Sequence, residues 1–384
     1  MTSERNKEIQ ALKKAELAEV AKVFFRLGCI GFGGPAVHIA MMEEEIVYKR
    51  KWITPEHFLD LVGATNLIPG PNSTELTMHL GHERAGWKGL VVAGSCFIFP
   101  AVVITAFFAW LYQQYGKLPQ IQPFIYGIKP AIIAVIVSLM IGLGKKAIKN
   151  VELGLIGVTA AVAVLLGYNE IYVLFSAGFL GVIINTVRKN GKVMKASFPV
   201  LLVKSMPFND SYSSFKLFLT FLKIGSILYG SGYVLFAFLD AELVSKGLLS
   251  KQELIDAIAV GHFTPGPVFS SATFIGWQIG GIAGAVGASI GIFLPSFLFV
   301  ALLNPLIPIL RKSKVFSAFL DTVNVASVAI ILSVVVEIGR STLADWRTIL
   351  IAILSFAVTF SFKKLNTAFV IFGGALLGFL LSNF

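Results

Sequence analysis

Residues 67–75 read LIPGPNSTE and residues 261–276 read GHFTPGPVFSSATFIG, and these two stretches decide the fold. Each contains a Pro-Gly-Pro triplet, at 69–71 and at 265–267, within a region apolar enough to lie in lipid. Proline removes a backbone N–H donor and disfavours helix at the residue before it, so each triplet predicts that one helix ends and another begins. Irregular backbone at membrane depth is tolerated only inside protein or beside a wet cavity. Paired breaks in two halves therefore predict the substrate site of a membrane transporter.

The composition places the chain in a membrane. Hydrophobic residues make up 56% of the 384 positions and charged residues 14%, whereas a soluble domain carries about 25% charged residues. Apolar stretches of about 18 residues or more recur along the sequence, and each can span a hydrocarbon core about 30 Å thick. The net charge of +11 is expected to reflect basic cytoplasmic loops near anionic lipid rather than binding of nucleic acid. The sequence thus predicts an all-α integral membrane protein surrounded by a lipid bilayer.

The two triplets belong to an internal repeat. Arg26 and Gly28 recur 197 positions later as Lys223 and Gly225. The triplets are 196 positions apart, and the glycines and prolines that follow them match at an offset of 195. We therefore expect a duplicated transporter. Its predicted domains are a first transporter repeat at 1–190, a basic cytoplasmic linker at 191–212 and a second transporter repeat at 213–384.

Each repeat is predicted to cross the membrane about five times and to carry a re-entrant hairpin with its Pro-Gly-Pro triplet at the tip. An odd number of crossings turns the second repeat upside down, so the repeats have inverted topology. Inversion places most basic loop residues on one side, among them Lys49, Lys146 and Lys149, and by the positive-inside rule that side is cytoplasmic. The expected hairpins are 57–82 and 253–280, and the expected spans are 20–42, 88–112, 123–144, 152–167, 170–187, 215–240, 283–310, 316–339, 347–362 and 366–383.

The helix starts behind the triplets offer backbone donors to an anion. The helix after Pro71 is expected to begin with the free N–H groups of Asn72, Ser73 and Thr74, at the positive end of the helix dipole. The second repeat is expected to do the same, and glycines interrupt the first span of each repeat as well. Glycine and proline also serve helix packing in membranes, but matched pairs of breaks favour a binding site. The candidate substrate-binding positions along these breaks are Gly33, Gly34, Pro35, Pro69, Gly70, Pro71, Asn72, Ser73, Gly230, Ser231, Pro265, Gly266, Pro267, Ser270 and Ser271.

Two cations complete the candidate substrate-binding set. Arg26 and Lys223 occupy matched positions, each two residues before a matched glycine in the first span of its repeat. An ionisable residue within lipid is costly and is by default a functional hypothesis, so both are predicted to balance the charge of a bound anion. The alternative is that each side chain extends to the lipid headgroups, because each lies near the start of its span.

Three titratable residues are candidates for coupling transport to a proton or ion gradient. Glu75 follows the first triplet by one turn and has no acidic counterpart in the second repeat. A buried carboxyl group there could carry a coupling proton, or it could cap the donors at the helix start. A histidine in water changes its charge near neutral pH, so His38 and His262 are the other two candidates, although a lone histidine also serves as a packing residue.

Motifs of enzymes and of ATP-driven pumps are missing from the sequence. It contains no nucleotide-binding loop, no zinc-ligand spacing and no catalytic triad. We therefore expect no enzymatic activity, no cofactor and no metal site. An intramembrane enzyme would need a convergent nucleophile and base, and a membrane scaffold would not need paired broken helices.

The same residues resemble a known family. The run Phe32-Gly33-Gly34-Pro35 with His38 and Trp52, followed by the stretches at 67–75 and 261–276, is similar to the chromate ion transporter superfamily, and within it to the long-chain, two-domain members. The resemblance covers nearly the whole chain. It implies secondary transport of chromate out of the cell, with sulfate as an isosteric competitor. It also implies halves of opposite orientation and residence in the inner membrane of a prokaryote.

Several alternatives stay open at the level of sequence. Residue types do not separate chromate from sulfate or another oxyanion, and a passive anion channel of the same fold would carry the same motifs. The coupling ion, the number of crossings and the choice between monomer and homodimer stay open too. Gly34-Pro35 is replaced by Ser231-Gly232 in the second repeat, so the two half-sites are not expected to bind an anion equally.

Overall fold

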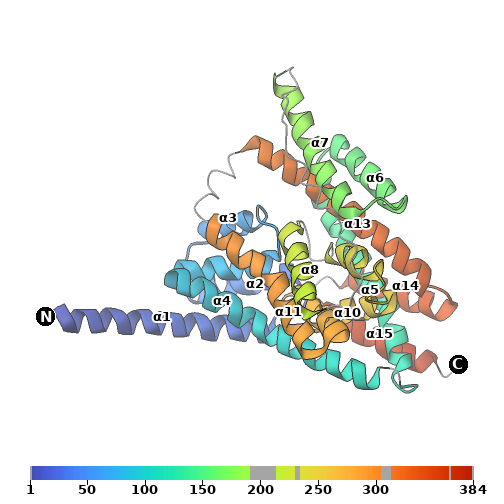
Figure 1. The fold of residues 1–384 in the computed structure, drawn as a ribbon, viewed down its shortest axis with the longest axis horizontal. Coiled ribbons are helices and arrows are strands. Elements are labelled where there is room, and N and C mark those ends of the chain that lie inside the picture. The colour runs from blue at the N-terminus through green and yellow to red at the C-terminus, as the bar shows by residue number, and fades with distance from the viewer. Residues whose placement is uncertain are drawn as a thin grey trace.

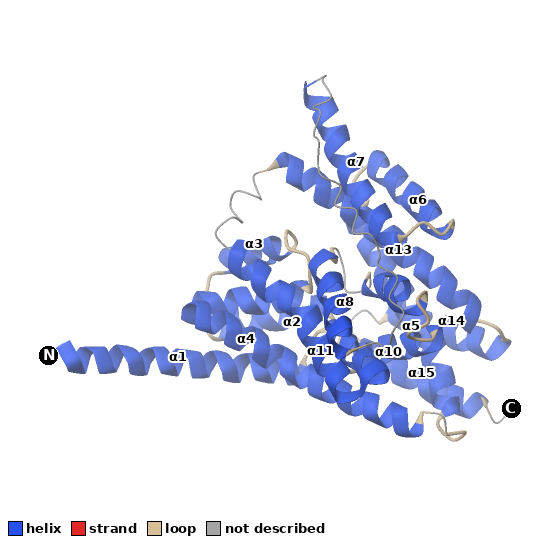
Figure 2. Ribbon diagram, viewed as in Figure 1, coloured by secondary structure: helices blue, strands red, loops and turns tan. Residues whose placement is uncertain are grey.

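The computed structural model describes residues 2–116, 118–190, 213–229, 234–303, 313–362 and 365–382. These residues are mostly helical and contain no strand (Figure 1, Figure 2). The prediction of an all-α protein is therefore confirmed. The predicted linker at 191–212 and the predicted site residues Gly230 and Ser231 lie outside the described residues.

The helices follow the same order in the two halves. In each half, several shorter helices precede one long, kinked helix. The first half contains α1 (Thr2–Ile30), α2 (Pro35–Met42), the π-helical η1 (Glu43–Lys49), α3 (Pro55–Thr65), α4 (Asn72–Tyr115), α5 (Gln122–Ala147), α6 (Val151–Leu165) and α7 (Glu170–Asn190). The second half contains α8 (Ser214–Ile227), α9 (Leu235–Leu239), the π-helical η2 (Asp240–Val244), α10 (Lys251–Phe263), the 3₁₀ turn η3 (Val268–Ser270), α11 (Ser271–Leu303), α13 (Lys314–Thr342), α14 (Trp346–Ser361) and α15 (Thr367–Leu381).

Matched capping residues start the equivalent helices α3 and α10. The Thr54 hydroxyl accepts a hydrogen bond from the N–H of His57 (3.3 Å), and Pro55 occupies the first helical position. The Ser250 hydroxyl accepts from the N–H of Glu253 (3.1 Å), whose carboxylate accepts in turn from the N–H of Ser250 (2.8 Å). The local sequence therefore determines where both helices that lead into the triplets begin.

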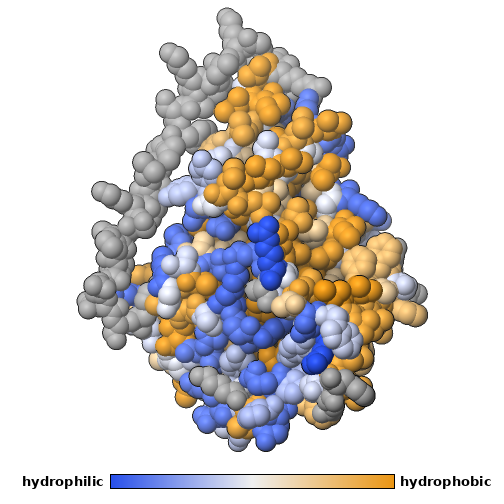
Figure 3. Space-filling view, turned by 90° about the vertical axis from the view of Figure 1, so that its right-hand side faces the viewer, coloured by the Kyte–Doolittle hydropathy of each residue, from blue (hydrophilic) through white to orange (hydrophobic). Residues whose placement is uncertain are grey.

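Several helices are suited to lipid. Among the described residues, five are long and apolar enough to cross a membrane: Asn72–Tyr115, Gln122–Ala147, Glu170–Val187, Val268–Leu302 and Lys314–Arg340. The shorter apolar helices α6, α14 and α15 pack against α5 or α13. Large apolar side chains such as Phe369 and Phe372 are exposed, and hydrophobic residues cover much of the upper and right part of the face in Figure 3. Because water disfavours such extended apolar surface, the chain is a multi-pass membrane protein.

The first expected span of each half is interrupted. The span expected at 20–42 is divided between α1, which ends at Ile30, and α2, which begins at Pro35. Gly33 and Gly34 between them have φ angles of 112° and 83°, a region that favours glycine. The span expected at 215–240 is likewise divided between α8 and α9.

The helix behind each triplet continues into the following span through a kink. In α4 the kink lies at Ala85 and Gly86, and Gly86 has a φ angle of 60°. In α11 it lies at Gly280 and Gly281, and Gly281 has a φ angle of 59°. A straight helix of 44 residues would be about 66 Å long, more than twice the hydrocarbon thickness of a bilayer, and the kink divides α4 into two shorter helical parts.

Matched glycines also make matched close contacts between helices. A Cβ on Gly28 of α1 would lie 2.6 Å from the carbonyl oxygen of Phe97 in α4, and a Cβ on Gly225 of α8 would collide with the carbonyl of Ile292 in α11. At the kinks, Gly81 lies against Gly89, as Gly276 does against Gly284. The internal repeat seen in the sequence therefore extends to the packing of the helices.

Candidate functional site

The breaks of the two halves meet at the centre of the molecule through a reciprocal pair of hydrogen bonds. The N–H of Gly70, in the first triplet, donates to the carbonyl oxygen of Leu228, where α8 ends (2.8 Å). The N–H of Gly266, in the second triplet, donates to the carbonyl oxygen of Gly31, where α1 ends (2.8 Å). Each triplet thus satisfies a carbonyl group that the broken helix of the other half leaves free.

Glycine is required at both central positions of the triplets. Gly70 and Gly266 have φ angles of 138° and 87°, which side chains rarely adopt. A Cβ on Gly70 would also run into the Glu75 carboxyl group and the Ser296 hydroxyl, and a Cβ on Gly266 would lie 2.8 Å from the Cβ of Ala101. The close approach of backbone to these groups brings the two halves together.

The helix starts behind the two triplets differ. In the first half α4 begins directly at Asn72, and the N–H groups of Thr74 and Glu75 both donate to the carbonyl oxygen of Pro71. The N–H groups of Asn72 and Ser73 are left as free donors within the described residues, whereas that of Thr74, which was also expected to be free, is used within the first turn. In the second half a 3₁₀ turn intervenes before α11, so the predicted equivalence of the two helix starts is only approximate.

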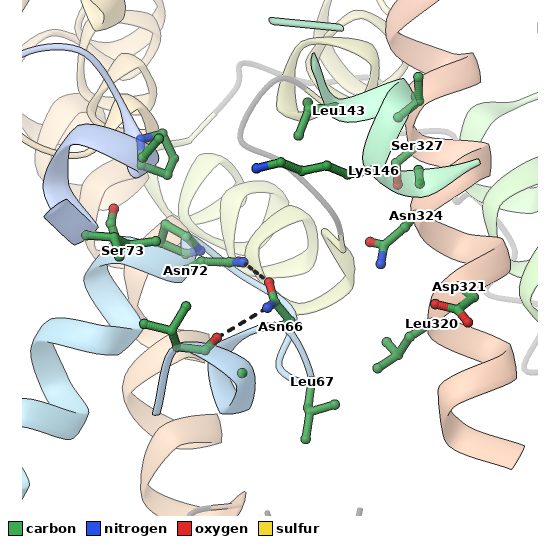
Figure 4. A pocket seen from close by; sticks show the side chains of 18 of the residues that line it. Asn66, Leu67, Asn72, Ser73, Leu143, Lys146, Leu320, Asp321, Asn324 and Ser327 are labelled. Atoms are coloured by element: carbon green, nitrogen blue, oxygen red, sulfur yellow. Dashed lines mark hydrogen bonds between the residues drawn. The ribbon is translucent and has the colours of Figure 1, made fainter. Parts of the chain in front are cut away.

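A cavity of about 710 Å³ lies between the first triplet and α13, and Figure 4 shows it from close by. Both halves contribute to its wall: the starts of α2 and α4, the end of α3, the end of α5, residues 267–269 and one side of α13. Its polar lining side chains are Asn66, Asn72, Ser73, Lys146, Lys149, Ser317, Asp321, Asn324 and Ser327.

Five of the predicted site residues line this cavity, namely Pro35, Pro71, Asn72, Ser73 and Pro267. The amide nitrogen of Asn72 donates to the amide oxygen of Asn66 (2.7 Å), which orients both side chains at the cavity wall (Figure 4). The other predicted residues of the triplets do not line the cavity but lie behind its wall; they are Pro69, Gly70, Pro265 and Gly266. The break between α1 and α2 contains Gly33 and Gly34.

The hydroxyls of Ser270 and Ser271 point into protein instead. The Ser271 hydroxyl donates to the carbonyl oxygen of Val268 (2.8 Å). The Ser270 hydroxyl accepts a hydrogen bond from the Thr105 hydroxyl (3.1 Å). Both serine residues are fully buried. The structure therefore gives these two hydroxyls partners inside the protein rather than a place on the cavity wall.

Arg26 and Lys223 also lie away from the cavity, and each forms an ion pair with a carboxylate 19 residues further along the chain. The Arg26 guanidinium contacts Glu45 at 2.8 Å, and the Lys223 ammonium contacts Glu242 at 2.5 Å. Glu45 and Glu242 are largely buried, at matched positions in η1 and η2. The structure thus differs from the expected arrangement, because a buried carboxylate in each half already neutralises the cation that was expected to face the substrate.

His38 connects the first break to the cavity wall. Its Nε2 lies 2.8 Å from the carbonyl oxygen of Gly31, and its Nδ1 lies 3.2 Å from the hydroxyl oxygen of Ser73. A carbonyl only accepts, so Nε2 carries a proton, and Nδ1 of the neutral ring accepts from the Ser73 hydroxyl. His262 is buried in the second half, with its ring 6.3 Å from that of Phe236.

Glu75 is the most isolated acid in the described part of the chain. Its side chain is 0% exposed, and neither carboxyl oxygen has a hydrogen-bond partner of acceptable geometry there. The Ser296 hydroxyl, also buried and unpaired, lies beside Gly70 on the same side. The Glu75 carboxyl group and the Ser296 hydroxyl therefore lie next to each other directly behind the first triplet.

The cavity contains cations that sequence reasoning did not assign to the site. Lys146 lies in the last turn of α5, and Lys149 follows that helix. The Lys149 ammonium pairs with the Asp321 carboxylate of α13 (2.7 Å). In the sequence these lysines looked like ordinary loop charges at the membrane surface, and only the packing of α5 against α13 brings them to the triplet.

The chain is similar in sequence to known proteins. A family model described as Chromate transporter matches residues 18–182 and again 215–379. The chain is 29% identical to a chromate transport protein of Cupriavidus metallidurans, over 94% of this chain and 92% of that protein. It is 28% identical to a probable chromate transport protein of Synechococcus elongatus (94% and 95% covered) and 26% identical to a chromate transport protein of Pseudomonas aeruginosa (93% and 90% covered). No solved structure gives a significant match.

Proposed function

The chain belongs to the chromate transporter family, and from this premise we propose that it is a secondary transporter that exports chromate across a prokaryotic cell membrane. The family consists of transport proteins, so the chain is a transport protein and not an enzyme. Sulfate and similar tetrahedral oxyanions are expected to compete for the same site.

The observation that carries the proposal is the cavity at the meeting point of the broken helices. An oxyanion needs several hydrogen-bond donors, and helix starts and amide side chains supply them without adding negative charge. The first turn of α4 offers the N–H groups of Asn72 and Ser73, and the amide side chains of Asn66 and Asn324 line the same cavity. We propose that chromate binds here, against the first triplet.

The position of the cavity supports export. It lies beside the end of α5 and the first turns of α13, where the basic residues predicted to face the cytoplasm gather. A cavity on this side can load chromate from the cell interior. In an inverted repeat, the two halves can exchange conformations and open the site to the other side. The reciprocal hydrogen bonds of Gly70 and Gly266 support such a two-fold relation.

Glu75 is the proposed carrier of a coupling proton. A carboxylate is costly to bury without a partner, whereas the neutral acid is not. Its carboxyl group lies one turn behind the donors of Asn72 and Ser73, so a proton that arrives or leaves changes the charge next to the anion site. His38, which bonds to Ser73, is a second candidate, and His262 is a third.

Transport by the purified protein in liposomes tests the proposal. With a pH gradient across the membrane, we expect chromate to accumulate above its equilibrium level, and we expect an uncoupler to abolish that accumulation. Excess sulfate should reduce the initial rate, and protein-free liposomes are the control. Flux that only equilibrates chromate would indicate a passive channel, and the absence of any oxyanion flux would refute the proposed function.

A further inference from the structure

The charges that line the cavity do not include the two cations expected from sequence. Within the described lining, the only lysine, arginine, aspartate or glutamate residues are Lys146, Lys149 and Asp321. Arg26 and Lys223 lie outside it, paired with Glu45 and Glu242. A doubly negative oxyanion that enters the cavity therefore meets full positive charge, among the described residues, only at Lys146 in the last turn of α5 and at Lys149 just after that helix.

Of the two cavity lysines, only Lys146 is available to a ligand. Lys149 is held by Asp321 at 2.7 Å, so its charge is already balanced. Lys146 forms no ion pair or hydrogen bond with any residue that the structure describes. Figure 4 shows its side chain extending from α5 into the space between α13 and Asn72.

Two neutral side chains with unused hydrogen-bond donors line the same cavity as Lys146. Asn324 projects from α13 on the opposite side of the cavity, and its amide makes no hydrogen bond within the described residues (Figure 4). Asn72 uses one amide hydrogen on Asn66 and keeps the other. A cavity that holds an ammonium group, two amides and a helix start matches the charge and the acceptor-rich surface of a tetrahedral oxyanion.

We propose that Lys146 is the cation that binds the oxyanion substrate in the cavity. The amide groups of Asn72 and Asn324 donate further hydrogen bonds to the same oxyanion. The proposal rests on the proposed function, and it adds the residue that recognises charge. Arg26 and Lys223 then hold the two π-helical segments η1 and η2 in place. Asp321 limits the positive charge by neutralising Lys149, and its removal would make the cavity more attractive to a dianion.

The kinetics of chromate uptake by Lys146 variants test the proposal, with Lys145→Gln as the matched control. Lys145 precedes Lys146 in α5 and is exposed, but it does not line the cavity. We expect Lys146→Gln to raise the KM for chromate about tenfold or more, because a charge-assisted hydrogen bond is lost. Lys146→Arg should stay within about threefold of the wild type, and Asp321→Asn should lower the KM. An unchanged KM in Lys146→Gln overturns the proposal.

A binding measurement separates this inference from the proposed function. In detergent, sulfate should raise the unfolding temperature of the wild type and of Lys145→Gln, but not that of Lys146→Gln. If the wild type moves no oxyanion yet shows this pattern, the transport proposal fails and the assignment of Lys146 stands. If the wild type transports chromate and sulfate stabilises Lys146→Gln as well as the control, the assignment of Lys146 fails and the transport proposal stands.

Discussion

Arg26 and Lys223 each form an ion pair with a buried carboxylate. This pairing explains why both halves carry a cation at the same position. Glu45 and Glu242 would be costly to bury without a counter-charge. Each carboxylate also has a second partner, Arg50 at 2.9 Å in the first half and Lys246 at 2.7 Å in the second. At the residue scale, each cation expected to face the substrate therefore contacts a buried carboxylate of η1 or η2.

Substitution of Arg26 should accordingly affect stability more than transport. The Arg26 side chain is about half exposed (54%), and in the variant Glu45 would still form its ion pair with Arg50. We therefore expect Arg26→Gln to lower the free energy of unfolding by about 1–2 kcal/mol. Its KM for chromate should stay within about twofold of the wild type. Thermal unfolding in detergent and uptake kinetics measure the two effects. Lys22→Gln, an exposed neighbour on α1, is the control, and a large rise in KM for Arg26→Gln would contradict this assignment.

Glu75 allows a second prediction at this scale. Glutamine has the shape of the protonated acid, so Glu75→Gln should fold and should still exchange chromate down its gradient. Because it cannot release or accept a proton, accumulation driven by a pH gradient should be lost. Proteoliposome uptake with and without the gradient separates the two activities. Gradient-driven accumulation by Glu75→Gln at the wild-type level would exclude Glu75 as the coupling residue.

At the scale of elements, the triplets show which features local sequence determines. Proline acts on its own residue and its neighbour, so residues 67–75 and 261–276 predicted both helix ends from sequence alone. The capping residues Thr54 and Ser250 act locally too. The kinks at Gly86 and Gly281 and the place of Lys146 depend on packing between distant helices, so periodicity and spacing did not reveal them.

The tip of the first triplet provides a prediction about this element. Gly70→Ala introduces strain at a φ angle of 138° and forces a methyl group against Glu75 and Ser296, so it should cost about 2–6 kcal/mol. Gly86→Ala is the matched control, because its φ angle is also positive but nothing lies within 4 Å of the added Cβ. It should cost only about 1–3 kcal/mol. Unfolding temperatures in detergent compare the two, and equal losses would contradict the close contact at the tip.

At the scale of the whole molecule, the two halves are related by sequence, by helix order and by reciprocal contacts at the triplets. Their relative orientation in the membrane stays a prediction, as do the domain boundaries at 190 and 213. The sequence predicted the duplication because matched glycines and prolines are visible at a nearly constant offset. It could not predict that α5 and α13 would enclose a cavity with the first triplet, because that arrangement arises only when the halves pack together.

Inverted topology predicts opposite accessibility at equivalent positions. Glu152 and Arg347 are both polar residues in the first turn of matched helices, α6 and α14, 195 positions apart. After Cys29 and Cys96 are replaced by alanine, single cysteines at 152 and 347 should react with an impermeant thiol reagent from opposite sides of the membrane. Labelling from the same side would show that the halves are parallel.

An experimental structure with a bound heavy oxyanion, such as molybdate or chromate, is the most direct test of the site between the broken helices. We predict density in the cavity, within hydrogen-bond distance of the Lys146 ammonium group and of the first turn of α4. Density beside Arg26 or Lys223 instead, or a cavity that stays free of the anion while transport proceeds, would contradict the proposed binding site.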